Sequence, residues 1–275
     1  MTILLAICQK EFKDGLRNRW IVAISLIFAL LAIGLAYFGS AAAGRVGFSS
    51  LPTTIISLAS LAVFIIPLIA LMLSYDSLVG EDENGTLLLL LSYPLSRWQL
   101  VLGKMLGHGL ILALSTLLGF GAAALVMGLF SDTTGWAALI PAFALFILSA
   151  ILLGWIFIAF AYVISAVVTE KSRAAGLSLF LWFLFVLVFD LGLLGLLVGT
   201  KGKVDAQLFP YLLLLNPTDI FRLVNISYFA QDQLSGLMAI AQHVRLGTGA
   251  LLITLTGWLL LPILLSLWLF NRREL

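Results

Sequence analysis

Long apolar runs separated by short polar segments make up the pattern of this chain. A helix needs about 20 apolar residues to cross a membrane, where every backbone group must be hydrogen-bonded inside the helix. Six runs are long enough: Trp20–Phe38, Thr54–Tyr75, Val101–Phe130, Ala138–Val168, Gly176–Val198 and Thr248–Phe270. The pattern predicts an all-α integral membrane protein of one domain over residues 1–275, with a six-helix bundle over 20–270 and a short tail over 271–275.

The segment before the first run predicts an amphipathic helix. Apolar and charged residues fall on opposite sides of residues 3–17 at helical spacing. The apolar set is Leu5, Cys8, Phe12 and Leu16, and the charged set is Lys10, Lys13, Asp14 and Arg17. We expect such a helix, over residues 1–19, to lie in the plane of the lipid headgroups. The alternative is a positively charged flank that only fixes the topology.

The composition excludes a soluble domain. Hydrophobic residues make up 62% of the chain and charged residues 10%, whereas soluble domains carry about 25% charged residues. No stripe of lysine and arginine with interleaved aromatic residues is present, which disfavours nucleic acid as a ligand. The single cysteine, Cys8, excludes an internal disulfide and a metal site built from cysteines alone.

The basic residues predict the orientation of the spans. With the N-terminus inside, the inner segments hold ten lysines and arginines and the outer segments hold five. Cytoplasmic loops carry the excess of these residues in membrane proteins. Both termini are therefore expected in the cytoplasm, as an even number of spans requires.

The first inner loop, residues 76–97, contains a short apolar run between charged ends. Three acids, Glu81, Asp82 and Glu83, precede Gly85, and five leucines follow at 87–91. Five residues are far fewer than the roughly 17 that a span needs. The leucines must be buried at the membrane interface, under the bundle, or in a groove on a cytoplasmic partner. A loop packed on its own helix ends is the alternative.

Two further segments do not span the membrane. The second inner loop, residues 169–175, is short and charged and predicts either a second contact or a turn. The last outer loop contains an apolar stretch at 209–217 that is too short to cross. A helix capped by Thr218 is expected to follow over residues 218–229, on the outer surface against the membrane or an external partner.

Asp190 is the only acid inside a predicted span. An ionised carboxylate in hydrocarbon is unfavourable by several kcal/mol unless it is paired or hydrated. Asp190 is therefore expected to face the interior of the bundle or a cavity. It is either part of a transport pathway or a hydrogen-bonded acid that joins helices, and the sequence leaves both possibilities open.

Other candidate chemistry is sparse. Met105 and His108 lie three residues apart on one predicted helix and could contribute two ligands to a soft metal, but two ligands make a weak site, and an interfacial histidine beside a core methionine is favoured. Gly103 and Lys104 do not form a phosphate-binding loop, because Trp98 stands where its first glycine would be. The spacings of Gly103 and Gly107 and of Gly195 and Gly199 allow close helix approach, for example across a dimer axis.

The motifs of the first inner loop resemble those of ABC-2-type transporter permeases. The resemblance lies in Glu81-x-Glu83-x-Gly85-Thr86-Leu87, then Pro94-Leu-Ser-Arg97, then Leu102-Gly-Lys104. The leading helix, the six spans and the helical last loop are similar to that family in layout. A narrower likeness, to the permease subunit of the bacterial nitrous-oxide-reductase maturation system, lies in Gly103-Lys-Met-Leu-Gly-His108 and Leu215-Asn-Pro-Thr-Asp-Ile-Phe-Arg222.

The resemblance implies a non-catalytic homodimer in the bacterial inner membrane, with two copies of a cytoplasmic ATPase and a periplasmic accessory protein as partners. ATP and magnesium would be bound by the ATPase, and no cofactor by this chain. The expected ATPase-coupling residues are Glu81, Glu83, Gly85, Thr86, Leu87, Leu90, Pro94 and Arg97. A second inner contact would comprise Glu170, Lys171 and Arg173. The periplasmic partner would meet Pro217, Asp219, Phe221 and Arg222.

The implied role in the narrower family is assembly of the copper–sulfur centre of nitrous oxide reductase. An exporter of lipid, polysaccharide or drug is the alternative within the broader family. A secondary transporter that uses Asp190 is the alternative outside it, although the repeated halves and interrupted helices of such folds are not evident in the sequence.

Overall fold

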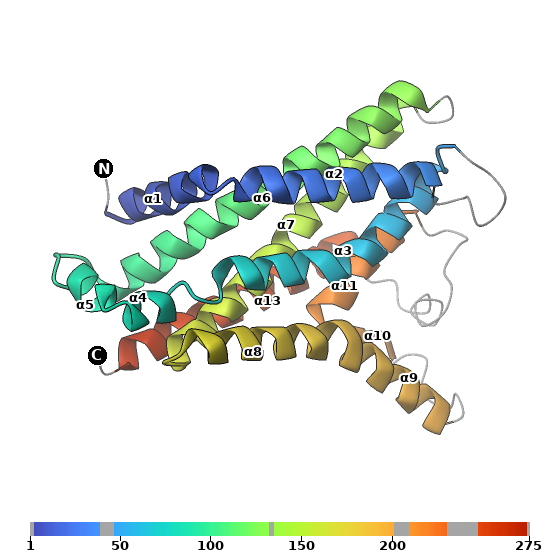
Figure 1. The fold of residues 1–275 in the computed structure, drawn as a ribbon. Coiled ribbons are helices and arrows are strands. Elements are labelled where there is room, and N and C mark those ends of the chain that lie inside the picture. The colour runs from blue at the N-terminus through green and yellow to red at the C-terminus, as the bar shows by residue number, and fades with distance from the viewer. Residues whose placement is uncertain (1–2, 39–46, 132–134, 201–208, 230–246, 274–275) are drawn as a thin grey trace.

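The computed structural model describes residues 3–38, 47–131, 135–200, 209–229 and 247–273, and every regular element among them is helical. Figure 1 shows these helices as an elongated bundle. In chain order they are α1 (Ile3–Arg17), α2 (Trp20–Phe38), α3 (Leu51–Ser74), α4 (Val79–Glu83), α5 (Thr86–Leu91), α6 (Arg97–Phe130), α7 (Trp136–Val167), α8 (Lys171–Phe183), the π-helix η2 (Leu184–Val188), α9 (Phe189–Gly199), α10 (Phe209–Leu213), α11 (Pro217–Phe229) and α13 (Thr248–Arg272).

Six helical segments are long and apolar enough to cross a membrane, which confirms the predicted all-α membrane fold. They are α2, α3 continued by α4, α6, α7, the continuous helix α8–η2–α9, and α13. Both chain ends lie at the same end of the bundle (Figure 1). We call this the terminal end, and the other the opposite end.

Helix α7 is the centre of the bundle. Of its most apolar 18-residue window, 56% is buried inside the chain, and it packs against α3, α6 and α13. The span α8–η2–α9 is peripheral, because only 11% of the corresponding window is buried. Most of that helix is therefore available to lipid or to another protein chain.

Helix α1 forms over the predicted residues and packs lengthwise against α6. A Cβ atom added at Gly103 would lie 3.1 Å from the carbonyl oxygen of Leu4, and one at Gly107 would lie 3.1 Å from that of Cys8. The two glycines thus bring α1 close to α6 within one chain. The place of α1 relative to the headgroup plane stays a prediction.

The first inner loop folds into two short helices, α4 and α5, separated at Gly85. Gly85 has a φ of 70°, in the left-handed region that glycine adopts without strain. Pro94 follows α5, and α6 begins after Ser96, whose backbone N–H donates to Oε1 of Gln99 at 3.0 Å. This hydrogen bond is one of the two that make up a capping box, a common motif at the start of helices.

Helix α11 forms as predicted, but it is not on the outer surface. It packs among α3, α7 and α13, and most of its side chains are buried. The preceding residue, Asn216, donates from Nδ2 to the carbonyl oxygen of Phe185 at 2.9 Å. Phe185 lies in the π-helix, where the regular α-helical hydrogen bonding is interrupted and a carbonyl can accept from another element. The expectation of a surface helix is therefore wrong.

Candidate functional site

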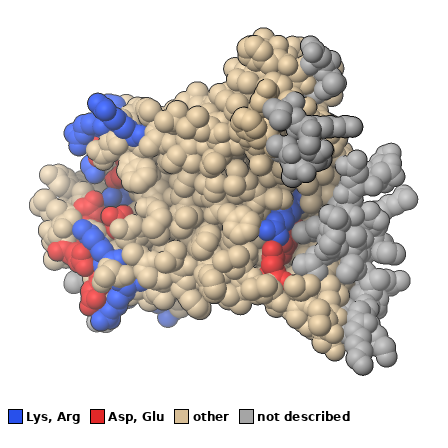
Figure 2. Space-filling view, turned by 45° about the vertical axis from the view of Figure 1, so that its right-hand side comes forward, with Lys and Arg blue, Asp and Glu red and all other residues tan. Residues whose placement is uncertain are grey.

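Charged side chains gather at the terminal end of the bundle, and a smaller charged group lies towards the opposite end (Figure 2). At the terminal end the three acids of α4 each form an ion pair with a different element. Their partners are Lys104 in α6, Arg273 after α13 and Lys171 in α8. We call this set of three pairs the α4 junction. It connects the first inner loop to three other parts of the chain.

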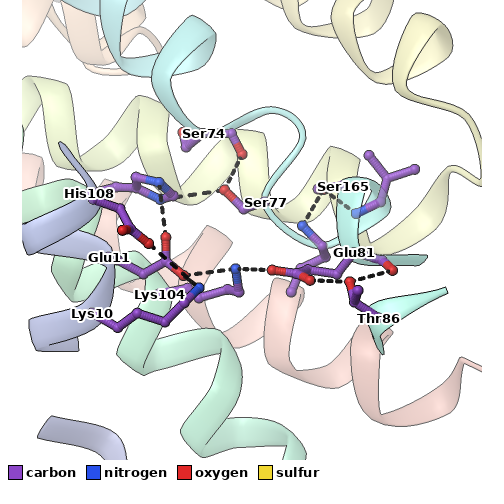
Figure 3. A network of polar contacts seen from close by, with 12 residues as sticks. Lys10, Glu11, Ser74, Ser77, Glu81, Thr86, Lys104, His108 and Ser165 are labelled. Carbon is purple, nitrogen blue, oxygen red and sulfur yellow. Dashed lines mark hydrogen bonds and ion pairs between the residues drawn. The ribbon is translucent and has the colours of Figure 1, made fainter. Parts of the chain in front are cut away.

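In the first pair of the junction the lysine is buried and the glutamate is partly buried. Lys104 Nζ lies 2.9 Å from Oε1 of Glu81 and 2.9 Å from Oε1 of Glu11 in α1 (Figure 3). The Lys104 side chain is only 6% exposed. Glu81 also accepts a hydrogen bond from the hydroxyl of Thr86. Burial alone would raise the pKa of Glu11, but the charge of Lys104 and its hydrogen bond outweigh burial and lower this pKa.

His108 belongs to a hydrogen-bonded group and not to an evident metal site. Its Nδ1 lies 2.9 Å from the hydroxyl of Tyr162. The same atom lies 3.4 Å from the hydroxyl of Ser77 (Figure 3). Met105 is buried in the core. In the part of the chain that the structure describes, no three residues of the types His, Cys, Asp and Glu are grouped so that they could hold a metal ion. The geometry therefore adds no support to the weak Met105–His108 candidate.

The second pair joins Asp82 to Arg273, with Oδ2 and Nη2 2.7 Å apart. Arg97, which the resemblance places in the ATPase contact, points to the same region. Its Nη1 donates to the carbonyl oxygens of Phe270, Asn271 and Arg273 at 3.0, 3.1 and 2.8 Å. Arg97 therefore caps the end of α13 within its own chain.

The third pair lies nearer the surface. Lys171 Nζ is 3.8 Å from Oε2 of Glu83, and the backbone N–H of Lys171 donates to Oε1 of Glu83 at 2.9 Å. Glu83 thereby caps the start of α8, where unpaired N–H groups favour a carboxylate. The other two residues of the predicted second contact, Glu170 and Arg173, pair with each other at 3.1 Å and are exposed. The second inner loop thus adjoins the first.

An apolar surface is exposed beside this junction. Leu88, Leu89, Tyr93 and Trp98 are 60%, 62%, 62% and 47% exposed. We call these four residues the α5 surface. Among the predicted contact residues, Gly85 and Pro94 are also exposed, Thr86 and Leu90 are half-buried, and Leu87 is fully buried. Leu87 therefore anchors α5 in the core, and its neighbours are the side chains left free for contact.

The charged group towards the opposite end connects Asp190 to α11. Arg222 Nη1 lies 2.6 Å from Oδ2 of Asp190 and 3.3 Å from Oδ1 of Asp219. Asp219 is 1% exposed and also accepts from Nδ2 of Asn216 at 3.1 Å. Asp190 thus faces a partner, as expected of an acid inside a span. This pairing supports a role in joining helices.

Three of the four residues predicted to meet a periplasmic partner are buried in the chain. Pro217, Asp219 and Phe221 are buried, and the Arg222 side chain is 17% exposed. A direct contact of the buried three with another protein would require α11 to leave the bundle. The partner itself stays a prediction.

The sequence interpretation missed the internal partners Glu11, Lys104, Asp82 and Arg273. One signal was available, because Lys104 falls inside a predicted apolar span and a buried cation needs a counter-ion. No comparable signal identifies Arg273, since an arginine after the last span is normal for a cytoplasmic tail.

Comparison with known proteins identifies the family of the chain. The family model of ABC-2 family transporter proteins matches residues 5–275. A Stutzerimonas stutzeri protein named "Probable ABC transporter permease protein NosY" is 55% identical over 268 residues, covering 97% of each chain. A Pseudomonas aeruginosa protein of the same name is 53% identical over 275 residues, covering 100% of each chain.

Both relatives are similar along their whole length, and the family match includes the leading helix, the α4 junction and α11. The chain belongs to the ABC-2 family of ABC transporters, as a multi-pass permease subunit that is not itself an enzyme and that works with a separate ATPase.

Proposed function

We propose that the chain docks its ATPase through the α5 surface and passes ATP-driven motion to the opposite end of the bundle. The observation that carries the proposal is the exposure of Leu88 and Leu89 on a helix of six residues. Such a helix cannot cross a membrane, and its apolar side chains fit the helix-in-groove mode of protein recognition. Leu87, fully buried, holds the helix against the bundle.

The α4 junction gives this surface a rigid base. A push on α5 is transmitted to α4, and from there to α1 and α6 through Lys104, to α8 through Lys171, and to α13 through Arg273. Rigid helices then carry the displacement along the bundle, as in other switching proteins. In this proposal the terminal end is cytoplasmic, the membrane is the bacterial inner membrane, and the permease acts as a homodimer with two ATPase subunits that bind ATP and magnesium.

We further propose that the transporter serves assembly of the copper–sulfur centre of nitrous oxide reductase, together with a periplasmic accessory protein. Support comes from the narrower motif resemblance and from full-length similarity to two proteins named NosY. The names of these relatives state no transported species. The permease would supply motion at its periplasmic end and not copper ligands of its own.

Docking is tested by co-purification of the ATPase with the permease from its native host in mild detergent. The double variant Leu88→Gln with Leu89→Gln should lose most of the ATPase and keep its elution profile as a folded membrane protein. Leu16→Gln is the matched control, because Leu16 is 48% exposed on α1 and should leave the ATPase bound. Wild-type ATPase content in the double variant would contradict the docking surface.

The maturation role has a separate test. Deleting the gene in a nitrous-oxide-reducing host should leave the reductase without the absorption of its copper–sulfur centre, and the wild-type chain should restore it. The Leu88→Gln, Leu89→Gln variant should not. Full maturation without the permease would overturn this role and leave the docking proposal standing.

A further inference from the structure

Arg273 makes contacts that the docking proposal does not require. Its guanidinium group lies at the end of α7, where Nη1 donates to the carbonyl oxygens of Ser165 and Ala166 at 3.2 and 3.4 Å, and Nη2 donates to that of Val168 at 3.0 Å. The last carbonyl groups of a helix have no partner within the helix. The cation also lies at the negative end of the α7 dipole. Arg273 therefore caps α7 from a different element.

The same guanidinium group holds the inner loop. Nη2 lies 2.7 Å from Oδ2 of Asp82, in α4, and the two side chains are 10% and 31% exposed. The planar arginine fork suits this combination, because its donors can serve several acceptors at fixed angles. One side chain thus connects α4 to the end of α7.

The backbone of Arg273 is held in turn by Arg97. The Nη1 donor of Arg97 is 2.8 Å from the carbonyl oxygen of Arg273 and also reaches two carbonyl oxygens at the end of α13. Arg97 is the first residue of α6. The two arginines therefore join the start of α6, the ends of α7 and α13, and α4.

Ser165 adds a second connection between α4 and α7. Its buried hydroxyl oxygen accepts from the backbone N–H groups of Leu78 and Val79, each at 3.0 Å. These are the unpaired donors at the start of α4. The other acids of α4 contact other helices, because Glu81 pairs with Lys104 in α6 and Glu83 pairs with Lys171 in α8. Among the described residues, Asp82 is the α4 side chain that pairs with Arg273, and Arg273 in turn bonds to the end of α7.

We propose that Arg273 is a positioning residue for coupling: it fixes α4 to the ends of α7 and α13, so that displacement of the docked inner loop moves these two spans. The inference rests on the proposed docking function and specifies a route beyond it. Loss of Arg273 should leave the α5 surface exposed and able to bind the ATPase. The connection of Asp82 to the ends of α7 and α13 would be lost, and the contacts of Ser165 would remain between α4 and α7.

The test compares hydrogen–deuterium exchange in the purified permease–ATPase complex without nucleotide and with ATP and vanadate. Peptides from α7 and α13 report the motion. In the wild type, nucleotide should change their exchange rates. Arg273→Gln loses the ion pair with Asp82 and the charged cap on α7. In this variant the nucleotide-dependent change should fall about tenfold, while ATPase content stays within about twofold of wild type.

Arg272→Gln is the matched control. Arg272 is the preceding residue, it is exposed, and its guanidinium carbon stacks 4.3 Å from the ring centre of Trp268 in its own helix. Its loss should leave the nucleotide response unchanged. Arg273→Lys keeps the charge but not the fork, and should restore part of the response.

Asp82→Asn is the second variant, because it weakens the α4 contact and leaves the cap on α7 in place. It should reproduce the uncoupling, and combining it with Arg273→Gln should add little. An unchanged nucleotide response in both single variants, with the ATPase bound, would refute the positioning role alone. An ATPase that never accompanies the wild-type chain would instead refute the docking function, and this route with it.

Discussion

Asp190 and Arg222 join the peripheral fifth span to a helix inside the bundle. Their closest side-chain atoms, Oδ2 and Nη1, are 2.6 Å apart, across 32 residues of sequence. The fifth span is the least buried of the six, and η2, the π-helix that precedes Asp190, accepts from Asn216 and Thr218 through the carbonyl oxygen of Phe185. These polar contacts help to hold a helix that is mostly exposed along its length.

The first prediction concerns this ion pair. Arg222→Met removes the cation that pairs with Asp190 and leaves this carboxylate beside Asp219 without a counter-ion, so it should lower the free energy of unfolding by about 3 kcal/mol. Asp190→Asn leaves Arg222 with Asp219 and should lower it by about 1 kcal/mol. Unfolding in detergent, followed by intrinsic fluorescence, measures both values. A larger loss for Asp190→Asn than for Arg222→Met would contradict this account of the cluster.

The same variant separates two kinds of transporter. In an ATP-driven permease whose Asp190 joins helices, Asp190→Asn should largely retain nucleotide-stimulated activity of the complex. A secondary transporter that uses Asp190 would lose ion-coupled uptake in vesicles. Vesicles with and without the ATPase subunit, energised by ATP or by an ion gradient, distinguish these outcomes.

The second prediction is a dependence of stability on pH. Burial raises the pKa of Asp219, and the nearby charge of Asp190 raises it further. The unfolded chain loses this proton near pH 3.9, whereas the folded chain keeps it to higher pH. The contribution of Asp219 is therefore fully present below pH 3.9 and is lost as the pH rises towards the raised pKa.

Asp219→Asn provides the corresponding measurement, because asparagine cannot release a proton. Thermal unfolding between pH 4 and 8 should show a smaller decline with rising pH in this variant than in the wild type. An equal decline in the two proteins would show that other groups cause it.

The sequence predicted the fold more completely than the site. Apolar run length is enough to locate six spans, because the membrane requires it whatever the side chains contact. The leucine run also predicted a short helix that does not span the membrane, but which leucine would be buried depends on the rotation of α5 about its axis. Leu87 is fully buried and Leu88 is 60% exposed, a difference that tertiary packing decides.

The roles of individual charges were harder to predict for the same reason. Arg97 belongs to a motif of the family, yet its guanidinium group bonds to backbone atoms more than 170 residues away. The sequence around an arginine does not show which helix end, far away in the chain, its side chain will cap. Asp190 was more predictable, because a carboxylate inside a span requires a partner even when the partner cannot be named.

The third prediction tests the buried group around Lys104. Lys104→Met leaves Glu11 and Glu81 without their shared cation in a buried site, and breaking such a pair is unfavourable by about 3–5 kcal/mol. Lys10→Met is the control, because Lys10 is 60% exposed and its ion pair with Glu11 is longer, at 3.4 Å. Its loss should change the free energy of unfolding by less than about 1 kcal/mol.

Low pH should reduce the contribution of the same group to the stability of the fold. The pKa of Glu11 is lowered in the folded chain, so its contribution is present above the unfolded pKa of about 4.3 and is lost as the pH falls through the lowered value. Lys104→Met should reduce this acid sensitivity. Similar losses of stability in Lys10→Met and Lys104→Met would contradict the central position of Lys104.

The fourth prediction concerns the packing of α1 against α6. A Cβ atom at Gly107 would lie 2.5 Å from Cβ of Glu11 and 3.1 Å from the carbonyl oxygen of Cys8, so Gly107→Ala must push α1 away. We expect a loss of about 1–3 kcal/mol. Gly121 in the same helix has no atom within 4 Å of such a Cβ, and Gly121→Ala should stabilise α6 slightly. Limited trypsin digestion should cleave α1 at Lys13 or Arg17 faster in Gly107→Ala alone. Equal cleavage in the two variants would show that α1 does not depend on this close approach.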